Sequence, residues 1–298
     1  MVKRHFLVVS LAVLAAFSFS SSVQAASAPK TLLWKVSSAH RVLYITGVTQ
    51  VLSPKDYPLP KQVTQGFSRS SELIVEGNAD AGAGEKEKVQ ALVFKEGLLP
   101  SGGKLTDLLN AEQQKLVKEA FAKSGVPFSS VNSMRPWLAA IMMMHATFVK
   151  LGVNPADQET LYFMKKAKHQ GLPVTPLQSQ SSMIKMAAGM AQTQQIAWLT
   201  MEARQFPKQS AQRPKVVAAW RNGDTKTLAK LLKKSFRGHP KLYQILVTDR
   251  NQRWLKVLKS RLNSSGKSVF VAVGAGHLAG QGNLINALRQ AGYKVTQL

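Results

Sequence analysis

The sequence contains no cysteine among its 298 residues. Disulfide bonds, thiol chemistry and lipid attachment through an N-terminal cysteine are therefore excluded, and packing alone must stabilise the fold. Acidic residues are scarce as well, because 15 Asp and Glu stand against 40 Lys and Arg, for a net charge of +25. A chain with this charge attracts anionic partners such as lipid headgroups, envelope polysaccharide or nucleic acid.

The positive charge is concentrated between Arg213 and Arg261, where fourteen Lys or Arg accompany only Asp224 and Asp249. This region is either a surface that binds an anionic envelope component or a solvated helical face that keeps the protein soluble. Aromatic residues make up only 7% of the chain, and no basic run is interleaved with aromatics for base stacking. No nucleic-acid partner is therefore expected.

Long hydrophobic runs are missing after the first 25 residues, so no transmembrane helix is expected in the mature chain. The N-terminal stretch has the three parts of a secretory signal: the charged Lys3 and Arg4, an apolar segment at 6–19 and a small-residue cleavage site at 23–25. The pattern predicts a periplasmic or secreted protein that loses residues 1–25 as a signal peptide. The remaining residues, 26–298, are enough for a single domain with a proper core.

The pattern of apolar residues predicts strands at both ends of the chain. Two runs before residue 47 indicate a hairpin, and a third short strand is expected at 72–76. Near the C-terminus, residues 268–273 and 293–298 indicate two strands joined by a Gly-rich loop and a helix. The expected fold class is α/β, with a central mixed sheet built from the N- and C-terminal strands.

The middle of the chain, about 104–265, has helical periodicity and is expected to form a large helical insertion or cap on that sheet. A helix beginning at Pro136 is apolar on nearly every side, so we expect it to be buried with His145 as a core residue. The segment 77–88 is rich in Gly and Ala and then charged, which favours a surface loop.

Polar side chains follow three of the predicted strands and a brief extended segment expected at 173–177. In α/β sheets the chemical site lies at the carboxyl ends of strands, so these side chains point into one cleft if the strands are neighbours. Glycines in the same loops allow sharp turns and close approach of a ligand. The residues concerned are Gly47 and Gln50, Glu76, Gln178, and Gly274, Gly276 and His277.

Several segments resemble, in order and spacing, the TraB/GumN family, which includes the TIKI-type membrane proteases. The resemblance covers nearly all of the chain after residue 25. It implies a fold similar to ChaN-like and erythromycin-esterase-like α/β proteins, and metal-dependent hydrolysis with motif His and Glu residues as ligands. The segments are LWKVSSAHRVLYITGVTQVLSPKDYPLP, SELIVEGNAD, LLPSGGKLTDLL, RPWLAA, DQETLYFMKKAKHQGLPVTPLQSQ, DRNQRW and VFVAVGAGHLAGQGNLINALRQAGYKV.

Four residues match the family's motifs position by position. His277 fits the second of two Gly-x-x-His motifs, and Glu76 fits a Glu at the end of an early strand. Arg250 and Asn251 fit an Arg-Asn pair that precedes the last strands.

Two other positions depart from the family's pattern. Gln50 stands where the first motif has His, and Gln178 stands where the family usually has Glu. A carboxamide is a much weaker ligand for a divalent transition metal than imidazole or carboxylate. Glu76 and His277 are then the two remaining metal ligands, for Zn, Mn or Co, whereas catalytic sites usually have three.

Two functions are compatible with this pattern. The favoured one is a divergent exported member, a pseudoenzyme with a degenerate metal site, which binds a small ligand or an anionic envelope component. The alternative is a metal-dependent hydrolase, peptidase or esterase-like, with Glu76, His277 and Arg250 as catalytic residues. The candidate ligand-binding residues are Gly47, Gln50, Gln178, Gly274, Gly276 and Asn251.

Overall fold

A computed structural model describes residues 30–77, 83–154 and 158–298. The predicted signal peptide lies outside these residues. The strands are β1 (Leu33–Ser37), β2 (Val42–Val48), β3 (Glu72–Val75), β4 (Val174–Pro176), β5 (Val269–Gly274) and β6 (Lys294–Gln297). The helices are α1 (Lys61–Ser68), α2 (Ala83–Gly97), α3 (Ala111–Ser124), α4 (Pro136–Lys150), α5 (Glu159–His169), α6 (Gln180–Ala188), α7 (Gln192–Gln205), α8 (Gln209–Arg221), α9 (Thr225–Ser235), α10 (Pro240–Tyr243), α11 (Asp249–Asn263) and α12 (Leu284–Gln290).

Within the described residues the strands form one six-stranded sheet in the order β4-β3-β5-β2-β1-β6. The four strands β4, β3, β5 and β2 run parallel, whereas β1 pairs antiparallel with β2 and with β6. The expected mixed α/β sheet is confirmed, and it joins strands from both ends of the chain. The short β4 comes from the helical middle and completes one edge.

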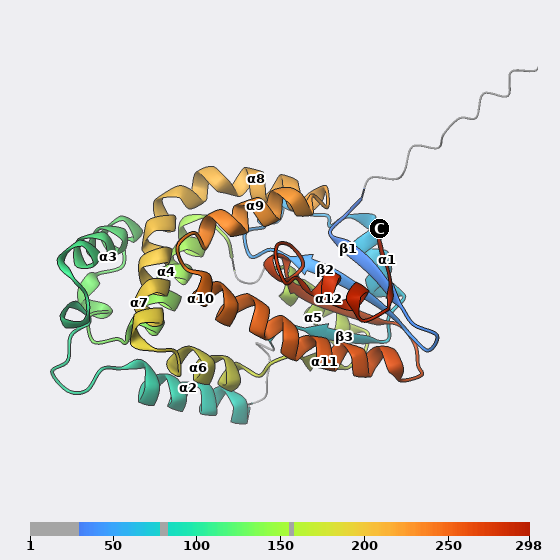
Figure 1. The fold of residues 1–298 in the computed structure, drawn as a ribbon, viewed down its shortest axis with the longest axis horizontal. Coiled ribbons are helices and arrows are strands. Elements are labelled where there is room, and N and C mark those ends of the chain that lie inside the picture. Colours follow the sequence, from blue (N-terminus) through green and yellow to red (C-terminus); the bar gives the residue numbers. More distant parts are fainter. Residues whose placement is uncertain (1–29, 78–82, 155–157) are drawn as a thin grey trace, which may run out of the picture.

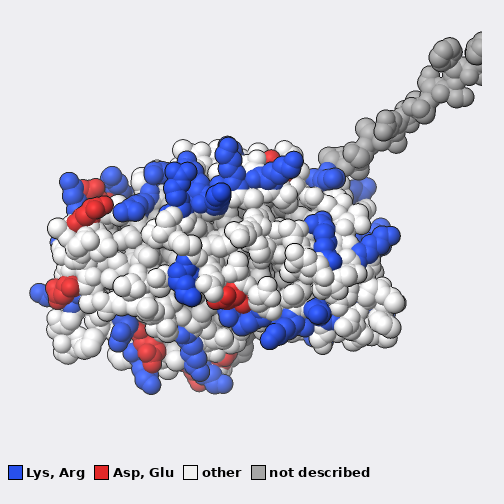
Figure 2. Space-filling view, in the orientation of Figure 1, with Lys and Arg blue, Asp and Glu red and all other residues white. Residues whose placement is uncertain are grey.

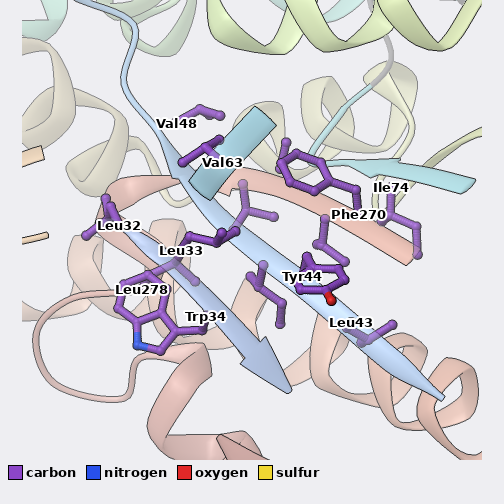
Figure 3. Packing of buried hydrophobic residues seen from close by; sticks show 14 of the residues in the cluster. Leu32, Leu33, Trp34, Leu43, Tyr44, Val48, Val63, Ile74, Phe270 and Leu278 are labelled. Atoms are coloured by element: carbon purple, nitrogen blue, oxygen red, sulfur yellow. The ribbon is translucent and has the colours of Figure 1, made fainter. Parts of the chain in front are cut away.

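The central strands of the sheet are buried because helices cover both faces. In Figure 1, α11 and α12 lie in front of the sheet, and α1 and α5 lie behind it. Every residue of β5 from Val269 to Val273 is buried, as a central parallel strand requires. The ring of Phe270 packs against two helices: its centroid lies 5.4 Å from the ring centroid of Phe67 in α1 and 4.8 Å from that of Phe163 in α5. Figure 3 shows Phe270 near Ile74 of β3 and Tyr44 of β2, the two strands that flank β5.

A second hydrophobic core holds the helical region together. It lies between α3, α4 and α7 and is built around Phe121, Trp137, Leu199 and Phe206. α3 begins at the capping box that the sequence indicates, in which Asn110 and Gln113 bond each other's backbone N–H groups. This helical region lies beside the sheet in Figure 1, on the side where the parallel strands end.

Two local predictions in this region are wrong. The predicted loop over 77–88 gives way to α2 from Ala83 on, because Glu85 accepts a 2.9 Å hydrogen bond from the backbone N–H of Ser181 and Val93 packs against the second core. These contacts add to helix propensity, because most residues of α2 from Glu85 on are strong helix formers such as Glu, Lys, Ala and Leu. The second error concerns His145 and not its helix. α4 is buried on all sides along its first turns, where every residue from Pro136 to Ala140 is buried, but His145 is exposed in its C-terminal half and is not a core residue.

None of the helices in residues 30–77, 83–154 and 158–298 has both the length and the apolar character that a membrane crossing needs.

We predict that Gly47→Ala destabilises the fold. Gly47 lies in β2, and a Cβ there would stand 2.4 Å from Cδ2 of the buried Leu32 and 3.1 Å from Cα of Ala275. We expect overpacking to lower the free energy of unfolding by about 1–3 kcal/mol, measured by urea denaturation. Gly84→Ala in α2 is the control, because a Cβ there meets nothing within 4 Å. Equal stability of the two variants would contradict the proposed clash.

Candidate functional site

The parallel strands bring the predicted residues to one edge of the sheet. Val75 of β3 is in register with Pro176 of β4 and with Ala272 of β5, so these strands end at nearly the same level. Glu76 directly follows β3, Gln178 follows β4 after one residue, and His277 lies three residues beyond the end of β5. Side chains far apart in the sequence therefore meet in the strand-end site, defined as Glu76, Gln178, Arg250, Asn251 and His277.

The guanidinium of Arg250 is the centre of this site. It comes from the first turn of α11, and its side chain is only 9% exposed. Its Nη2 donates to Glu76 Oε1 at 2.6 Å, its Nε donates to Gln178 Oε1 at 3.1 Å, and its Nη1 lies 3.4 Å from His277 Nε2. One cation thus links side chains that follow three different strands.

Asn251, the next residue of α11, orients the imidazole. Its Nδ2 donates to the backbone oxygen of Gly282 at 2.9 Å, which leaves its Oδ1 to accept from His277 Nδ1 at 2.8 Å. This hydrogen-bond network assigns the proton of His277 to Nδ1 and a lone pair to Nε2, facing Arg250. Burial lowers the pKa of His277 to about 4, and the charge of Arg250 adds to the effect against that of Glu76. His277 is neutral at pH 7.

Glu76 is held ionised by its neighbours. Burial raises the pKa of its carboxyl, but the charge of Arg250 and the backbone N–H of Gly274 together lower the pKa below its usual value. That N–H donates to Glu76 Oε2 at 3.0 Å. A Cβ on Gly274 would stand 3.1 Å from the same oxygen, so the absence of a side chain lets the carboxylate approach the end of β5.

Trp254 is a part of the site that the sequence interpretation missed. Its ring centroid lies 4.6 Å from the Arg250 guanidinium and 4.4 Å from the His277 ring, and the side chain is buried. The indole therefore forms an apolar wall that fixes both groups. Its spacing of four residues from Arg250 on an amphipathic helix was a usable signal, because residues i and i+4 share a face.

The loop that follows β2 does not join the strand-end site. Gln50 is exposed, and its side chain makes no hydrogen bond to any residue that the structure describes. The backbone N–H of its neighbour Thr49 instead donates to Glu159 Oε2 at 2.6 Å. Glu159 begins α5 and is fully buried, and burial raises its carboxyl pKa well above the usual value. Gly276 faces α9, because its Cβ position lies 3.4 Å from Leu232.

A divalent metal does not fit the strand-end site as it is arranged. Glu76 Oε1 and His277 Nε2, the two predicted ligand atoms, are 3.9 Å apart. Arg250 places a permanent positive charge within hydrogen-bond distance of both, where an ion would need those lone pairs. No group of three His, Asp or Glu in the described part of the chain could hold a metal ion. The two atoms that could bind a metal are thus already in contact with a guanidinium.

Comparison with known proteins identifies the family of this chain. The family model described as the TraB/PrgY/gumN family matches residues 32–297. The chain belongs to this family. Within it, the chain is 24% identical over 250 residues to the uncharacterized protein YbaP of Escherichia coli (strain K12), covering 84% of this chain and 89% of YbaP.

A second TraB/PrgY/gumN relative is YbaP of Shigella flexneri, 25% identical over 232 residues, which covers 78% of this chain and 82% of that protein. No solved structure gives a significant match to the chain. The family match spans both the sheet and the helical region, so the whole described fold is that of a family member.

We predict that Arg250→Met lowers the free energy of unfolding by about 1–3 kcal/mol at pH 7, because it leaves the half-buried carboxylate of Glu76 without its cation. The lowered pKa of Glu76 means that the ion pair stabilises the protein above the unfolded pKa, about 4.3, and that this stabilisation is lost as the pH falls through the folded pKa. The difference between variant and parent should therefore shrink towards pH 3. Urea denaturation across this range measures it.

Arg253→Met is the control for this experiment, because Arg253 lies on the exposed face of the same helix and forms no ion pair with the described residues. We expect a change of about 0.5 kcal/mol or less that is independent of pH. A pH-independent loss for Arg250→Met as well would show that packing on Trp254, and not the charge pair, is what the substitution removes.

Proposed function

We propose that this TraB/PrgY/gumN protein binds a small polar ligand at the strand-end site without a divalent metal, with Arg250 in the place of the cation. The observation that carries the proposal is the contact of one guanidinium with Glu76, Gln178 and His277. The cation is built into the chain, so the carboxylate and the imidazole need no ion to stay in position.

The balance of charge in the site favours a ligand that is recognised through hydrogen bonds and carries no net charge. Glu76 and Arg250 neutralise each other, and His277 is uncharged at pH 7. Glu76 is 28% exposed, and the half-buried Gln178 lies beside it, so a carboxylate and an amide remain accessible at the sheet edge. An amide both donates and accepts, which suits a neutral or zwitterionic polar molecule.

A metal-dependent hydrolase is the competing function, and the neighbouring carboxylate and neutral imidazole of Glu76 and His277 favour it. Two ligands at about 2.1 Å from a common tetrahedral ion lie roughly 3.4 Å apart, so Glu76 Oε1 and His277 Nε2, now 3.9 Å apart, would also have to move closer together. Hydrolysis of a peptide or ester bond would then need Arg250 to withdraw from both atoms. In that case Arg250 would become free to stabilise developing negative charge.

Metal titration separates the two functions. We predict that the unmodified protein binds Zn, Mn and Co weakly. Gln178→Glu alone should change the metal affinity little, because Arg250 still contacts the carboxylate of Glu76 and the imidazole of His277. Arg250→Ala combined with Gln178→Glu removes the cation and adds a carboxylate, so we expect affinity to rise by about tenfold or more. Isothermal titration calorimetry measures both. Adding His277→Ala to the double variant should abolish the gain.

Tight, stoichiometric binding by the unmodified protein that is lost on His277→Ala would overturn the metal-free proposal in favour of the hydrolase. Failure of the double variant to bind any better than its parent would contradict the assignment of Arg250 as the group that replaces an ion.

We also propose that the protein acts after export, which rests on the signal pattern of residues 1–25. The mature chain should begin at Ala26, and Edman sequencing or intact-mass measurement of the exported fraction tests this. Ala25→Arg should block processing because signal peptidases require a small residue before the cut. An exported protein that retains residues 1–25 would show that the segment is not a cleaved signal.

A further inference from the structure

Five basic side chains form a row along α9 and its C-terminal end. They are Lys226, Lys230, Lys233, Lys234 and Arg237, all of them exposed, and we call this row the α9 ridge. The spacing of four, three, one and three residues puts them on one side of the helix, since a turn takes 3.6 residues. Figure 2 shows Lys and Arg gathered along the margin of the molecule that α8 and α9 form.

The opposite side of α9 is already occupied. Leu228 is 8% exposed, and Leu232 approaches the Cβ positions of Gly276 and Gly280 to 3.4 Å. The helix therefore uses its apolar residues to pack on the fold and has none left to insert into a bilayer. Any partner of the ridge must be bound by charge at the surface.

The charge of the ridge has little compensation from the protein itself. Asp224 is the only acidic residue from position 203 to position 248, a stretch with eleven Lys or Arg. That carboxylate caps α9 by accepting from the backbone N–H of Thr227 at 2.9 Å. No ridge residue takes part in an ion pair with the described residues. The like charges of such a row repel one another, and an anionic surface would reduce that repulsion.

The form of the ridge favours a lipid surface over a polymer. Aromatic side chains, which would stack on bases or sugar rings, are withdrawn from it: Trp220 is buried, and Phe236 and Tyr243 are half-buried. The ridge is a row of point charges roughly 16 Å long on the outside of a helix, and it lies at the margin of the molecule, not in a groove. All five side chains of such a row can contact a flat, densely charged surface simultaneously.

We propose that the α9 ridge docks the protein on an anionic lipid bilayer as a peripheral, non-inserting contact. This inference does not depend on the function proposed for the strand-end site, although the two are adjacent. Leu232 packs on the loop that carries His277, and the hydroxyl of Tyr243 donates to the backbone oxygen of Gln281 in that loop at 2.7 Å. Docking would hold the loop about one helix diameter, roughly 10 Å, from the headgroups.

Vesicle binding tests the proposal with purified protein. Equal parts of phosphatidylglycerol and phosphatidylcholine supply the anionic surface, and phosphatidylcholine alone supplies the neutral one. We expect cosedimentation with the anionic vesicles only, weakening steeply as salt rises from about 0.05 to 0.5 M. Replacing Lys226, Lys230, Lys233 and Lys234 by Gln should weaken binding by about 100-fold or more, because each lysine near such a surface contributes about 1 kcal/mol.

A matched control removes the same charge elsewhere. Lys86, Lys88, Lys115 and Lys123 are exposed on α2 and α3, and replacing them by Gln also lowers the net charge by four. This variant should bind within about threefold of the parent, whereas equal weakening of both variants would show that net charge alone acts and would overturn the ridge assignment. Circular dichroism confirms that both fold. All three proteins carry the same N-terminus, so any contribution from it cancels.

Three other results would also overturn the proposal: binding to neutral vesicles of equal strength, absence of binding to anionic vesicles at low salt, and ridge-dependent binding to dextran sulfate without binding to lipid. The last result would assign the ridge to an anionic polysaccharide. None of them bears on metal affinity at the strand-end site, so the two proposals fail independently.

Discussion

The buried guanidinium of Arg250 is the constraint on which the strand-end site depends. It lies among groups that would each be destabilising alone in a site of this kind: a carboxylate largely shielded from water, an amide oxygen and an imidazole lone pair. A planar cation with five N–H donors bonds all three at once in fixed directions, whereas a water molecule has only two donors and the three donors of a lysine rotate about one nitrogen. The stacking of Arg250 on Trp254 fixes the plane in which those donors point.

The sheet makes this arrangement possible. Four parallel strands end along one edge, and the helical region supplies both Gln178, through β4, and Arg250, through α11. The two hydrophobic cores therefore have different roles: one packs the sheet against helices that include α11, the helix of Arg250, and the other holds α3, α4 and α7 together beside the strand ends. The site forms where the two parts of the fold meet, and this is why its residues are spread over most of the chain.

Much of the fold and part of the site could be predicted from local patterns. The alternation of apolar runs and turns indicated the hairpin, the parallel unit near the C-terminus and the short extended segment that becomes β4. The motif residues indicated Glu76, Gln178, Arg250 and His277, which the structure brings together. The prediction failed at α2, whose first residues were assigned to a surface loop, and at His145, which is exposed in the C-terminal half of an otherwise largely buried helix.

The sequence by itself determined the α/β class, the ends of helices such as α3, and the uneven charge, because each depends on residues near one another in the chain. Only the tertiary structure decided that Arg250 bonds Glu76 across 174 positions, that Gln50 faces solvent, and that the lysines of α9 form no ion pair with the residues that the structure describes. Those outcomes depend on strand order and helix packing, which place distant side chains a few Ångströms apart or on separate surfaces. No local pattern contains that information, since it arises from how the whole chain buries its apolar residues.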